Sequence, residues 1–168
     1  EAPKGHLDEI GVAEKLLSFR KLDPAVRGVS FDTIAAFGDH SASPHYIADE
    51  KSNRKIMGDG LLLLDSGGQY VGGTTDITRT LSVGTPSEDM RTRYTATLKA
   101  HIAVARAIFP KGTTGAFFDS LARAQVWQEG IDFGHSLGHG VGCYLGVHEP
   151  GVWFASKSNE DVPQGALV

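Results

Sequence analysis

Residues 60–80 read GLLLLDSGGQYVGGTTDITRT, and this stretch determines the fold that we expect. Four leucines lead into Asp65, and such an apolar run is typical of a buried strand. The turn signal Ser66-Gly67-Gly68 follows, and the segment 74–83, rich in Thr and Ile, predicts a second strand. If the two strands pair as a hairpin, Asp65 and Asp76 lie near each other across the ladder, within reach of one ion.

Helical patterns lie on both sides of these strands. Residues 7–22 carry acidic side chains early, basic side chains late and apolar positions at near-helical spacing, which predicts an amphipathic helix. Residues 85–88 form a capping box with proline at the first helical position, and the helix that follows is expected to end at Pro110. Its apolar face is expected to comprise Met90, Tyr94, Leu98, Ile102, Ala105 and Phe109. A third helix is expected over residues 115–129, with Phe117, Leu121 and Trp127 as its apolar contacts.

The order of these elements predicts an α+β fold. A short strand is expected before Gly38, followed by a polar loop that carries His40 and His45. We therefore expect antiparallel strands with helices on one face of the sheet. A chain of 168 residues with 40% hydrophobic content is long enough for one core, so we expect a single domain over residues 1–168.

The composition indicates which classes of partner and which cellular compartment to expect. The net charge is −4 without a Lys/Arg block, which argues against nucleic acid or an anionic membrane and favours a small polar or peptide-like ligand. Cys143 is the single cysteine, so it cannot form an internal disulfide, and we expect it to pack inertly in an apolar strand over residues 142–148. No apolar run has the length of a membrane span, so we expect a reducing, cytoplasmic location.

The two aspartates admit two interpretations from the residues alone. Asp favours turns and strand ends, so Asp65 and Asp76 are either surface turn residues or members of a site. The leucines before Asp65 imply that a buried strand delivers its carboxylate into a low-dielectric environment. That is costly unless a cation or another partner neutralises the charge. A divalent metal ion is one such partner, and Arg79 is a rival.

The segment GHSLGHGVG, residues 134–142, places His135 and His139 among four glycines. Their i, i+4 spacing resembles that of zinc ligands on a helix, but the glycines disfavour a helix and the glutamate of HExxH is absent. The two histidines are either satisfied loop residues or side chains that a tightly folded backbone aims at a ligand. His148 follows the strand expected over residues 142–148 and could reach the same cleft.

Four segments carry a resemblance to a known family. They are DSGGQYVGGTTDITRT (65–80), FPKGTTG (109–115), GHSLGHGVG (134–142) and VHE (147–149). Together they closely resemble the metallopeptidases with the pita-bread fold, and within that family the Xaa-Pro aminopeptidases of the long multidomain type. The resemblance runs from Leu7 through Glu149 and implies an α+β pita-bread fold with a curved antiparallel sheet and helices on its outer face.

The resemblance implies a hydrolase with two divalent metal ions, usually Mn²⁺ with Zn²⁺ or Co²⁺ as alternatives, that removes the residue before a proline. It implies that Asp65, Asp76 and His139 are metal ligands, with Asp76 bridging both ions. It also implies that His45, His135 and His148 contact the substrate and stabilise the tetrahedral intermediate. The implied partners are peptides with proline at the second position and, for the intact protein, a second copy in a homodimer.

Further members of the implied ligand set are two glutamates in segments that would follow Val168. We therefore expect an incomplete catalytic domain, truncated at its C-terminus, that binds metal weakly and is inactive or nearly so by itself. The family's usual HGTGHG reads HSLGHG here, with Ser136 and Leu137 as the departures, and Pro150 replaces the glycine that usually follows VHE.

Two alternatives to the aminopeptidase stay open. The first is a prolidase that acts on Xaa-Pro dipeptides, because selectivity for peptide length depends on segments outside this sequence. The second is a pita-bread module without catalytic activity that binds peptides or partner proteins. The presence of Asp65, Asp76 and His139 argues against the second alternative.

Overall fold

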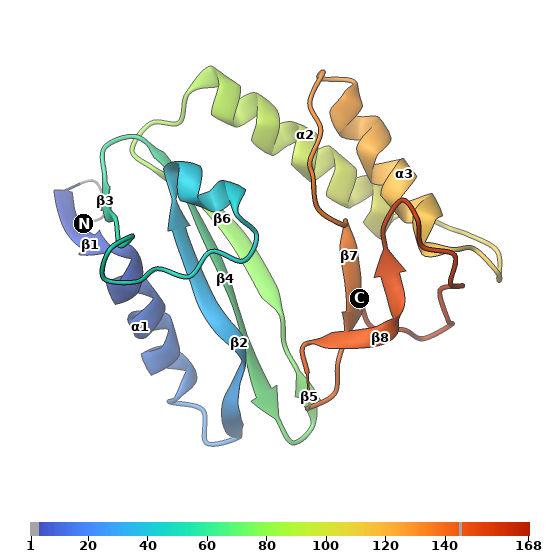
Figure 1. Ribbon diagram of the computed structural model, residues 1–168, viewed down its shortest axis with the longest axis horizontal. Coiled ribbons are helices and arrows are strands. Elements are labelled where there is room, and N and C mark those ends of the chain that lie inside the picture. The colour runs from blue at the N-terminus through green and yellow to red at the C-terminus, as the bar shows by residue number, and fades with distance from the viewer. Residues whose placement is uncertain (1–3, 145) are drawn as a thin grey trace. The chain divides into compact units, whose positions relative to one another are not determined.

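The computed structural model describes residues 4–144 and 146–168, and these pack as two compact units. The first unit comprises residues 1–87 and 142–147, and the second comprises residues 88–141 and 148–168. Helices and antiparallel strand pairs occur in both units (Figure 1). The predicted α+β class is therefore confirmed. No helix in the described part of the chain is long and apolar enough to cross a membrane.

The first unit is built around strand β4 (Gly60–Tyr70). It pairs antiparallel with β2 (Val26–Phe37) on one side and with β5 (Gly73–Thr74) and β6 (Ile77–Val83) on the other. Helix α1 (Glu9–Arg20) packs beside β2, as Figure 1 shows. The remaining elements are β1 (Lys4–Asp8), paired with β3 (Lys55–Met57), and the short 3-10 helix η1 (Gly38–Ala42).

A compact apolar cluster joins these elements. Phe37 at the end of β2, Ile56 on β3 and Leu62 on β4 are buried together with Val83 at the end of β6. Leu7, Val12 and Leu64 pack against this cluster. The leucine run that predicted a buried strand therefore supplies only part of the core, because alternate side chains of β4 face opposite sides of the sheet.

The turn predicted at Ser66-Gly67-Gly68 is wrong, because β4 continues through these residues to Tyr70. The glycines serve close packing instead. A Cβ atom on Gly67 would lie 2.0 Å from Ser30 Oγ and 2.1 Å from the carbonyl oxygen of Thr75. Only a residue without a side chain allows the neighbouring backbone to approach this closely. The second predicted strand is confirmed as β5 and β6, which are separated by Thr75 and Asp76.

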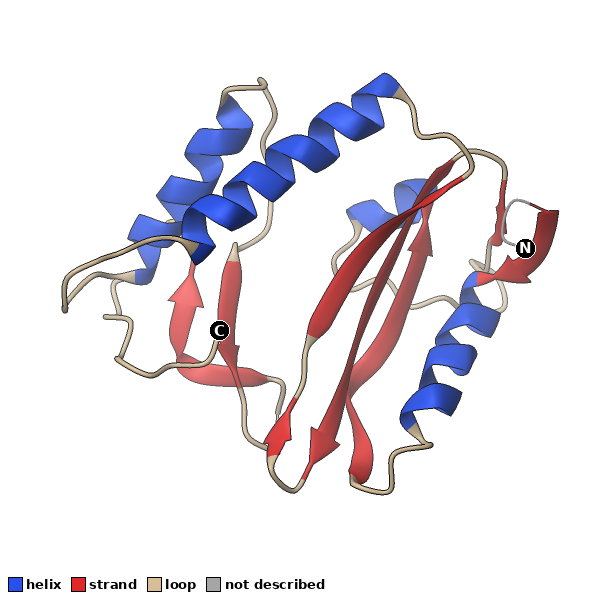
Figure 2. Cartoon of the chain, turned by 180° about the vertical axis from the view of Figure 1, so that it is seen from behind, coloured by secondary structure: helices blue, strands red, loops and turns tan. Residues whose placement is uncertain are grey.

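The second unit pairs two helices with a two-stranded sheet (Figure 2). Its elements are α2 (Glu88–Ala105), α3 (Gly115–Trp127), β7 (Gly138–Val141) and β8 (His148–Phe154). Phe118 of α3 stacks on Phe154 of β8 with ring centroids 4.7 Å apart. A Cβ atom on Gly115 would lie 1.8 Å from the carbonyl oxygen of Trp153, so this glycine lets the start of α3 approach β8 closely.

Both helices of this unit bury different faces from those predicted. Helix α2 ends at Ala105 instead of Pro110, and its predicted apolar face is exposed, with Tyr94 47%, Leu98 45% and Ile102 44% accessible. The buried face carries Ala96 and Ala100, which pack against Ala122 and Val126 of α3. On α3, Phe117 and Trp127 are exposed, and their neighbours Phe118 and Val126 are buried. Small alanine side chains let the two helices approach closely, and hydrophobicity alone did not reveal this.

The first predicted helix is confirmed as α1, but it begins at Glu9 because Asp8 caps it. Asp8 has extended backbone dihedrals, and its Oδ1 accepts a hydrogen bond of 2.9 Å from the amide of Gly11. Its Oδ2 lies 3.1 Å from Lys55 Nζ. The Gly11 hydrogen bond, followed by Lys55, lowers the pKa of Asp8 below its ordinary value of 3.8.

Replacing Asp8 separates these two contributions. We expect Asp8→Ala to lower the free energy of unfolding by about 1 kcal/mol, because it removes the helix cap. Asp8→Asn keeps a capping side chain and removes only the charge. Because the folded pKa is lowered, the carboxylate contributes stability above pH 3.8 that is lost as pH falls through the folded pKa. Urea unfolding at several pH values should show the wild-type advantage over Asp8→Asn at pH 7 and its disappearance in acid; a difference that is independent of pH would contradict this.

Candidate metal centre

Asp65 lies in the middle of β4, where the register with β6 is continuous and the register with β2 shifts between Phe31 and Ile34. Its ladder partners are Ile34 on β2 and Thr78 on β6. The carboxylate oxygen Oδ1 is buried from solvent. A buried carboxylate is unfavourable unless hydrogen bonds or a cation compensate for its lost hydration. The expectation that β4 delivers this carboxylate into a protected environment is therefore met.

Asp76 lies directly before β6 on the neighbouring strand of the same ladder. Ser66 pairs with Ile77 and Asp65 pairs with Thr78, so Asp76 and Asp65 are diagonal neighbours. Such neighbours lie on one face of a sheet at a separation of about 7–8 Å between their α-carbons. The hairpin on which the two-aspartate prediction depended is thus present.

Thr75 holds the backbone before Asp76 against β4. Its amide donates to the carbonyl of Gly68 at 2.9 Å, and its Oγ1 accepts from the amide of Gly68 at 3.0 Å. The carbonyl of Thr75 accepts from Ser30 Oγ at 2.8 Å. These hydrogen bonds, together with the close approach at Gly67, restrain the position of Asp76 relative to β4.

Arg79, the rival partner for Asp65, lies opposite Leu64 in the ladder. Side chains alternate between the two faces of a strand, so this register directs Arg79 and Asp65 to opposite faces. The Arg79 side chain is exposed and donates to the carbonyl of Thr78 at 2.7 Å. The register therefore favours the metal interpretation over the Arg79 ion pair.

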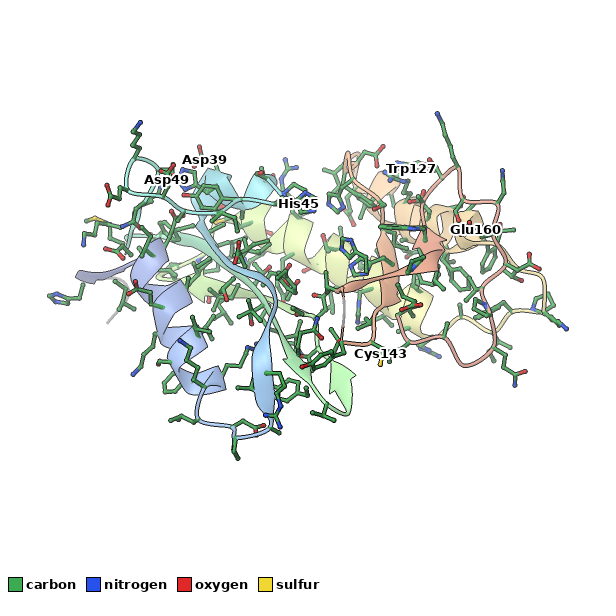
Figure 3. All side chains as sticks on the ribbon, turned by 60° about the horizontal axis from the view of Figure 1, so that its bottom comes forward. Asp39, His45, Asp49, Trp127, Cys143 and Glu160 are labelled. Atoms are coloured by element: carbon green, nitrogen blue, oxygen red, sulfur yellow. The ribbon has the colours of Figure 1, made fainter. Side chains whose placement is uncertain are left out.

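His45 is the third proposed site residue of the first unit. It follows η1 in a turn within the long connection between β2 and β3, and its side chain is exposed (Figure 3). The expected polar loop is present, and His40 lies at its start inside η1.

The second unit carries His135, His139 and His148. His139 is the second residue of β7, and His135 lies in the connection that precedes this strand. Each ring directs Nδ1 at a backbone carbonyl, His139 at Gly140 over 2.9 Å and His135 at Ser136 over 2.7 Å. A carbonyl only accepts, so Nδ1 carries the proton and Nε2 of the neutral ring has the lone pair. This is the tautomer that a metal ligand or a proton acceptor at Nε2 requires.

The rings of His139 and His148 lie together, with centroids 4.0 Å apart. His148 begins β8, and Trp153 of the same strand lies 5.4 Å from its ring and 5.9 Å from that of His139. The structure therefore brings two of the three predicted site histidines of this unit, His139 and His148, into one cluster. Strand β8 begins at His148, and the described residues 142–144 and 146–147 form no strand, so the strand predicted over residues 142–148 is wrong for these residues. Cys143 is exposed instead of packed.

Sequence reasoning missed Arg123, which organises the connection carrying His135. Its guanidinium contacts both oxygens of Asp119 at 2.8 and 3.2 Å and Asp132 at 2.8 Å. It also donates to the carbonyls of Phe133 at 2.6 Å and His135 at 2.9 Å. The hydrogen bond with Asp119 is the main cause that raises the pKa of Arg123. The i, i+4 spacing of Asp119 and Arg123 was the only signal in the sequence.

The residues predicted to bind metal, Asp65, Asp76 and His139, are of types that divalent ions accept. Carboxylate oxygens and an imidazole nitrogen are ligands that Mn²⁺, Zn²⁺ and Co²⁺ all accept. Asp65 and Asp76 belong to the first unit, and His139 belongs to the second. Within either unit taken by itself, the described residues gather no group of three His, Cys, Asp or Glu side chains that could hold a metal ion.

Comparison with known proteins supplies the family. The model of metallopeptidase family M24 matches residues 3–167. The chain belongs to the metallopeptidase family M24. It is 45% identical over 161 residues to a probable Xaa-Pro aminopeptidase P of Arthroderma gypseum, covering 95% of this chain and 25% of that protein. The chain thus spans about a quarter of the length of this curated relative.

Solved structures of family M24 confirm the predicted pita-bread fold. An X-prolyl aminopeptidase from Caenorhabditis elegans, described as a cytosolic enzyme with a di-nuclear active site, superposes with a TM-score of 0.88 at 41% identity. That match covers 96% of this chain and 27% of the nematode chain. The prolidase from Pyrococcus furiosus gives a TM-score of 0.83 at 35% identity, covering 94% of this chain and 45% of that one.

The variant Gly67→Ala tests whether β4 needs a residue without a side chain at this position. We expect Gly67→Ala to lower the free energy of unfolding by about 2 kcal/mol or more, because the added Cβ meets Ser30 and the Thr75 backbone. Gly73→Ala is the matched control, since a Cβ there meets nothing within 4 Å, and we expect a change of about 0.5 kcal/mol or less. Urea unfolding of both variants measures the difference. Equal stabilities of the two variants would show that β4 tolerates a side chain at Gly67.

Substitutions of Arg123 test whether its contacts hold the connection that carries His135. We expect Arg123→Ala to cost about 3 kcal/mol of unfolding free energy, because it leaves the buried Asp119 carboxylate without its charged partner. Arg123→Lys keeps the charge but loses the fork geometry, so its cost should be intermediate. The exposed Arg106→Ala is the control and should change the unfolding free energy by about 0.5 kcal/mol or less.

NMR spectra of the same variants report on the connection itself. The amide signals of residues 133–137 should shift in both Arg123 variants and stay in place in Arg106→Ala. If those amides keep their wild-type positions in Arg123→Ala, Arg123 does not hold this connection.

Proposed function

We propose that the protein carrying this chain is a metal-dependent aminopeptidase that releases the N-terminal residue from peptides with proline at the second position. The observation that carries this proposal is the 45% identity to an Xaa-Pro aminopeptidase P over 95% of the chain. The β4–β6 ladder supports it further, because it places Asp65 and Asp76 as diagonal neighbours on one strand pair.

Asp65, Asp76 and His139 are the proposed metal ligands. The two carboxylates supply anionic oxygens, and His139 presents Nε2 with its lone pair because Nδ1 donates to Gly140. When bound, a pair of divalent ions supplies an activated water and polarises the scissile carbonyl. The di-nuclear site of the nematode relative supports two ions, and Mn²⁺ is our proposal for their identity, with Zn²⁺ or Co²⁺ as alternatives.

In this proposal the other three predicted site histidines contact the substrate. His45, His135 and His148 are exposed and can donate an N–H to the substrate or to the developing oxyanion. Donation at Nε2 requires a protonated His135 ring, because its Nδ1–H already faces the Ser136 carbonyl. A shaped contact for proline accounts for selectivity, because the peptide bond before proline has no N–H to recognise.

Three ligands hold a metal pair weakly, since the resemblance implies two further glutamates for a full site. We therefore propose that the 168-residue chain alone is an incomplete catalytic domain with weak metal binding. The location and assembly of the complete protein are also proposals: cytoplasmic, as described for the nematode relative, and a homodimer, which light scattering can test.

Metal binding by the chain tests the ligand assignment without an activity assay. In calorimetric titrations with Mn²⁺ we expect weak binding by the wild-type chain, abolished in Asp65→Asn and Asp76→Asn because each loses an anionic ligand. Asp32→Asn, at an exposed position of β2, is the control and should bind like wild type. Tight binding of two ions by these residues alone would refute the incomplete site, and unaltered binding by the Asp65 and Asp76 variants would refute the assignment.

Activity of the complete protein tests the reaction. We expect hydrolysis of a tripeptide with proline at the second position, lost after chelation and lost in His139→Ala. A preference for the Xaa-Pro dipeptide would instead identify a prolidase, which the similarity to the Pyrococcus furiosus enzyme favours as the second candidate. Binding of such peptides without hydrolysis or metal dependence would identify a non-catalytic module.

A further inference from the structure

Glu9 is a carboxylate for which the proposed chemistry has no role, although it is completely buried. Its side chain is 0% exposed, and it is the first residue of α1. Sequence reasoning counted it among the acidic residues that favour a helix N-terminus. An ionised carboxylate without contact to solvent needs several hydrogen-bond donors, and these donors show what Glu9 holds together.

Both oxygens of Glu9 receive hydrogen bonds from the two ends of one connection. Oε1 accepts from the amide of Phe37 at 2.7 Å, where β2 ends. Oε2 accepts from the amide of Arg54 at 3.0 Å, directly before β3 begins. The single carboxylate therefore closes the connection of residues 38–54 at its base.

Two side chains within this connection also donate to Glu9. The hydroxyl of Tyr46 donates to Oε2 at 2.7 Å, and His40 Nδ1 lies 2.9 Å from Oε1. His40 Nε2 accepts from the Arg54 guanidinium at 2.9 Å, so the neutral ring carries its proton on Nδ1, facing Glu9. The rings of His40 and Tyr46 contact each other with centroids 4.5 Å apart.

Tyr46 is the point where this network reaches the proposed site. It directly follows His45, whose side chain is exposed and lies in a turn. Burial is the main cause that raises the pKa of Tyr46, and Glu9 contributes, so the hydroxyl remains protonated and donates. The backbone of His45 is therefore anchored through its neighbour to a buried carboxylate.

We propose that Glu9 is a positioning residue for His45, acting through the Tyr46 hydroxyl. The inference rests on the proposed function for the role of His45, and on contacts within the first unit for the anchoring itself. A loop histidine that must donate to a transition state gains from a restrained backbone, because misplacement by about 1 Å can cost two orders of magnitude in rate.

Tyr46→Phe in the complete protein is the decisive variant, because it removes only the hydroxyl and keeps the ring. We expect kcat for the Xaa-Pro tripeptide to fall by about tenfold with KM nearly unchanged, since the oxyanion exists only in the transition state. In a His45→Ala background, Tyr46→Phe should cause no further loss. Tyr94→Phe, at an exposed position of α2, is the matched control and should leave kcat unchanged.

A readout without activity separates this inference from the proposed function. In isotope-labelled protein, the His45 ring signals should shift in Tyr46→Phe and stay in place in Tyr94→Phe. Glu9→Gln should also shift the His45 ring signals, because the NH₂ group of glutamine cannot accept the hydrogen bonds that one carboxylate oxygen of Glu9 accepts. If the Glu9→Gln variant does not fold, the Tyr46→Phe variant still shows whether this network positions His45.

Two results would overturn the inference: unmoved His45 signals in Tyr46→Phe, or an equal loss of kcat with and without His45. If the wild-type protein hydrolyses no Xaa-Pro peptide, the proposed function fails, and the ring signals still decide whether the Glu9 network positions His45.

Discussion

The pairing of β4 with strands on both sides is the constraint on which the first unit depends. Asp65 lies between Ile34 and Thr78 in this ladder, so the position of its carboxylate follows from backbone hydrogen bonds on both sides. A register slip of one residue would move it to the opposite face. Because β2 is the same strand that ends at Phe37, the ladder also sets where the connection carrying His45 begins.

Sequence reasoning succeeded where one local signal matched the tertiary structure. The leucine run predicted β4, and the Thr- and Ile-rich segment predicted its partner, so the relation between Asp65 and Asp76 followed from pairing alone. It failed at Ser66-Gly67-Gly68, because the same glycines serve as turn residues or as close-packing residues. Only the approach of Ser30 and Thr75, distant in sequence from each other, distinguishes the two.

The helices and the buried acids show a second limit. The larger apolar side chains of α2 predicted a face through Leu98, but Ala96 and Ala100 are buried, because contact between helices favours small side chains where backbones come close. Glu9 is one of the acidic residues typical of a helix N-terminus, and no pattern in the sequence indicates that it is buried. Its burial depends on hydrogen-bond donors that lie 28 to 45 positions away along the chain. Pair contacts over such separations leave no periodic pattern in a single sequence.

Two buried carboxylates, Glu9 and Asp119, hold connections in place through their donor contacts. Both oxygens of Glu9 face N–H and O–H donors, and both oxygens of Asp119 face the Arg123 guanidinium. A carboxylate used in this way has its lone pairs directed at protein hydrogens, and a cation would have to displace them. These two acids therefore hold connections, one before His45 and the other before His139. The positions of Asp65 and Asp76 come instead from the pairing of β4 with the chain at β6.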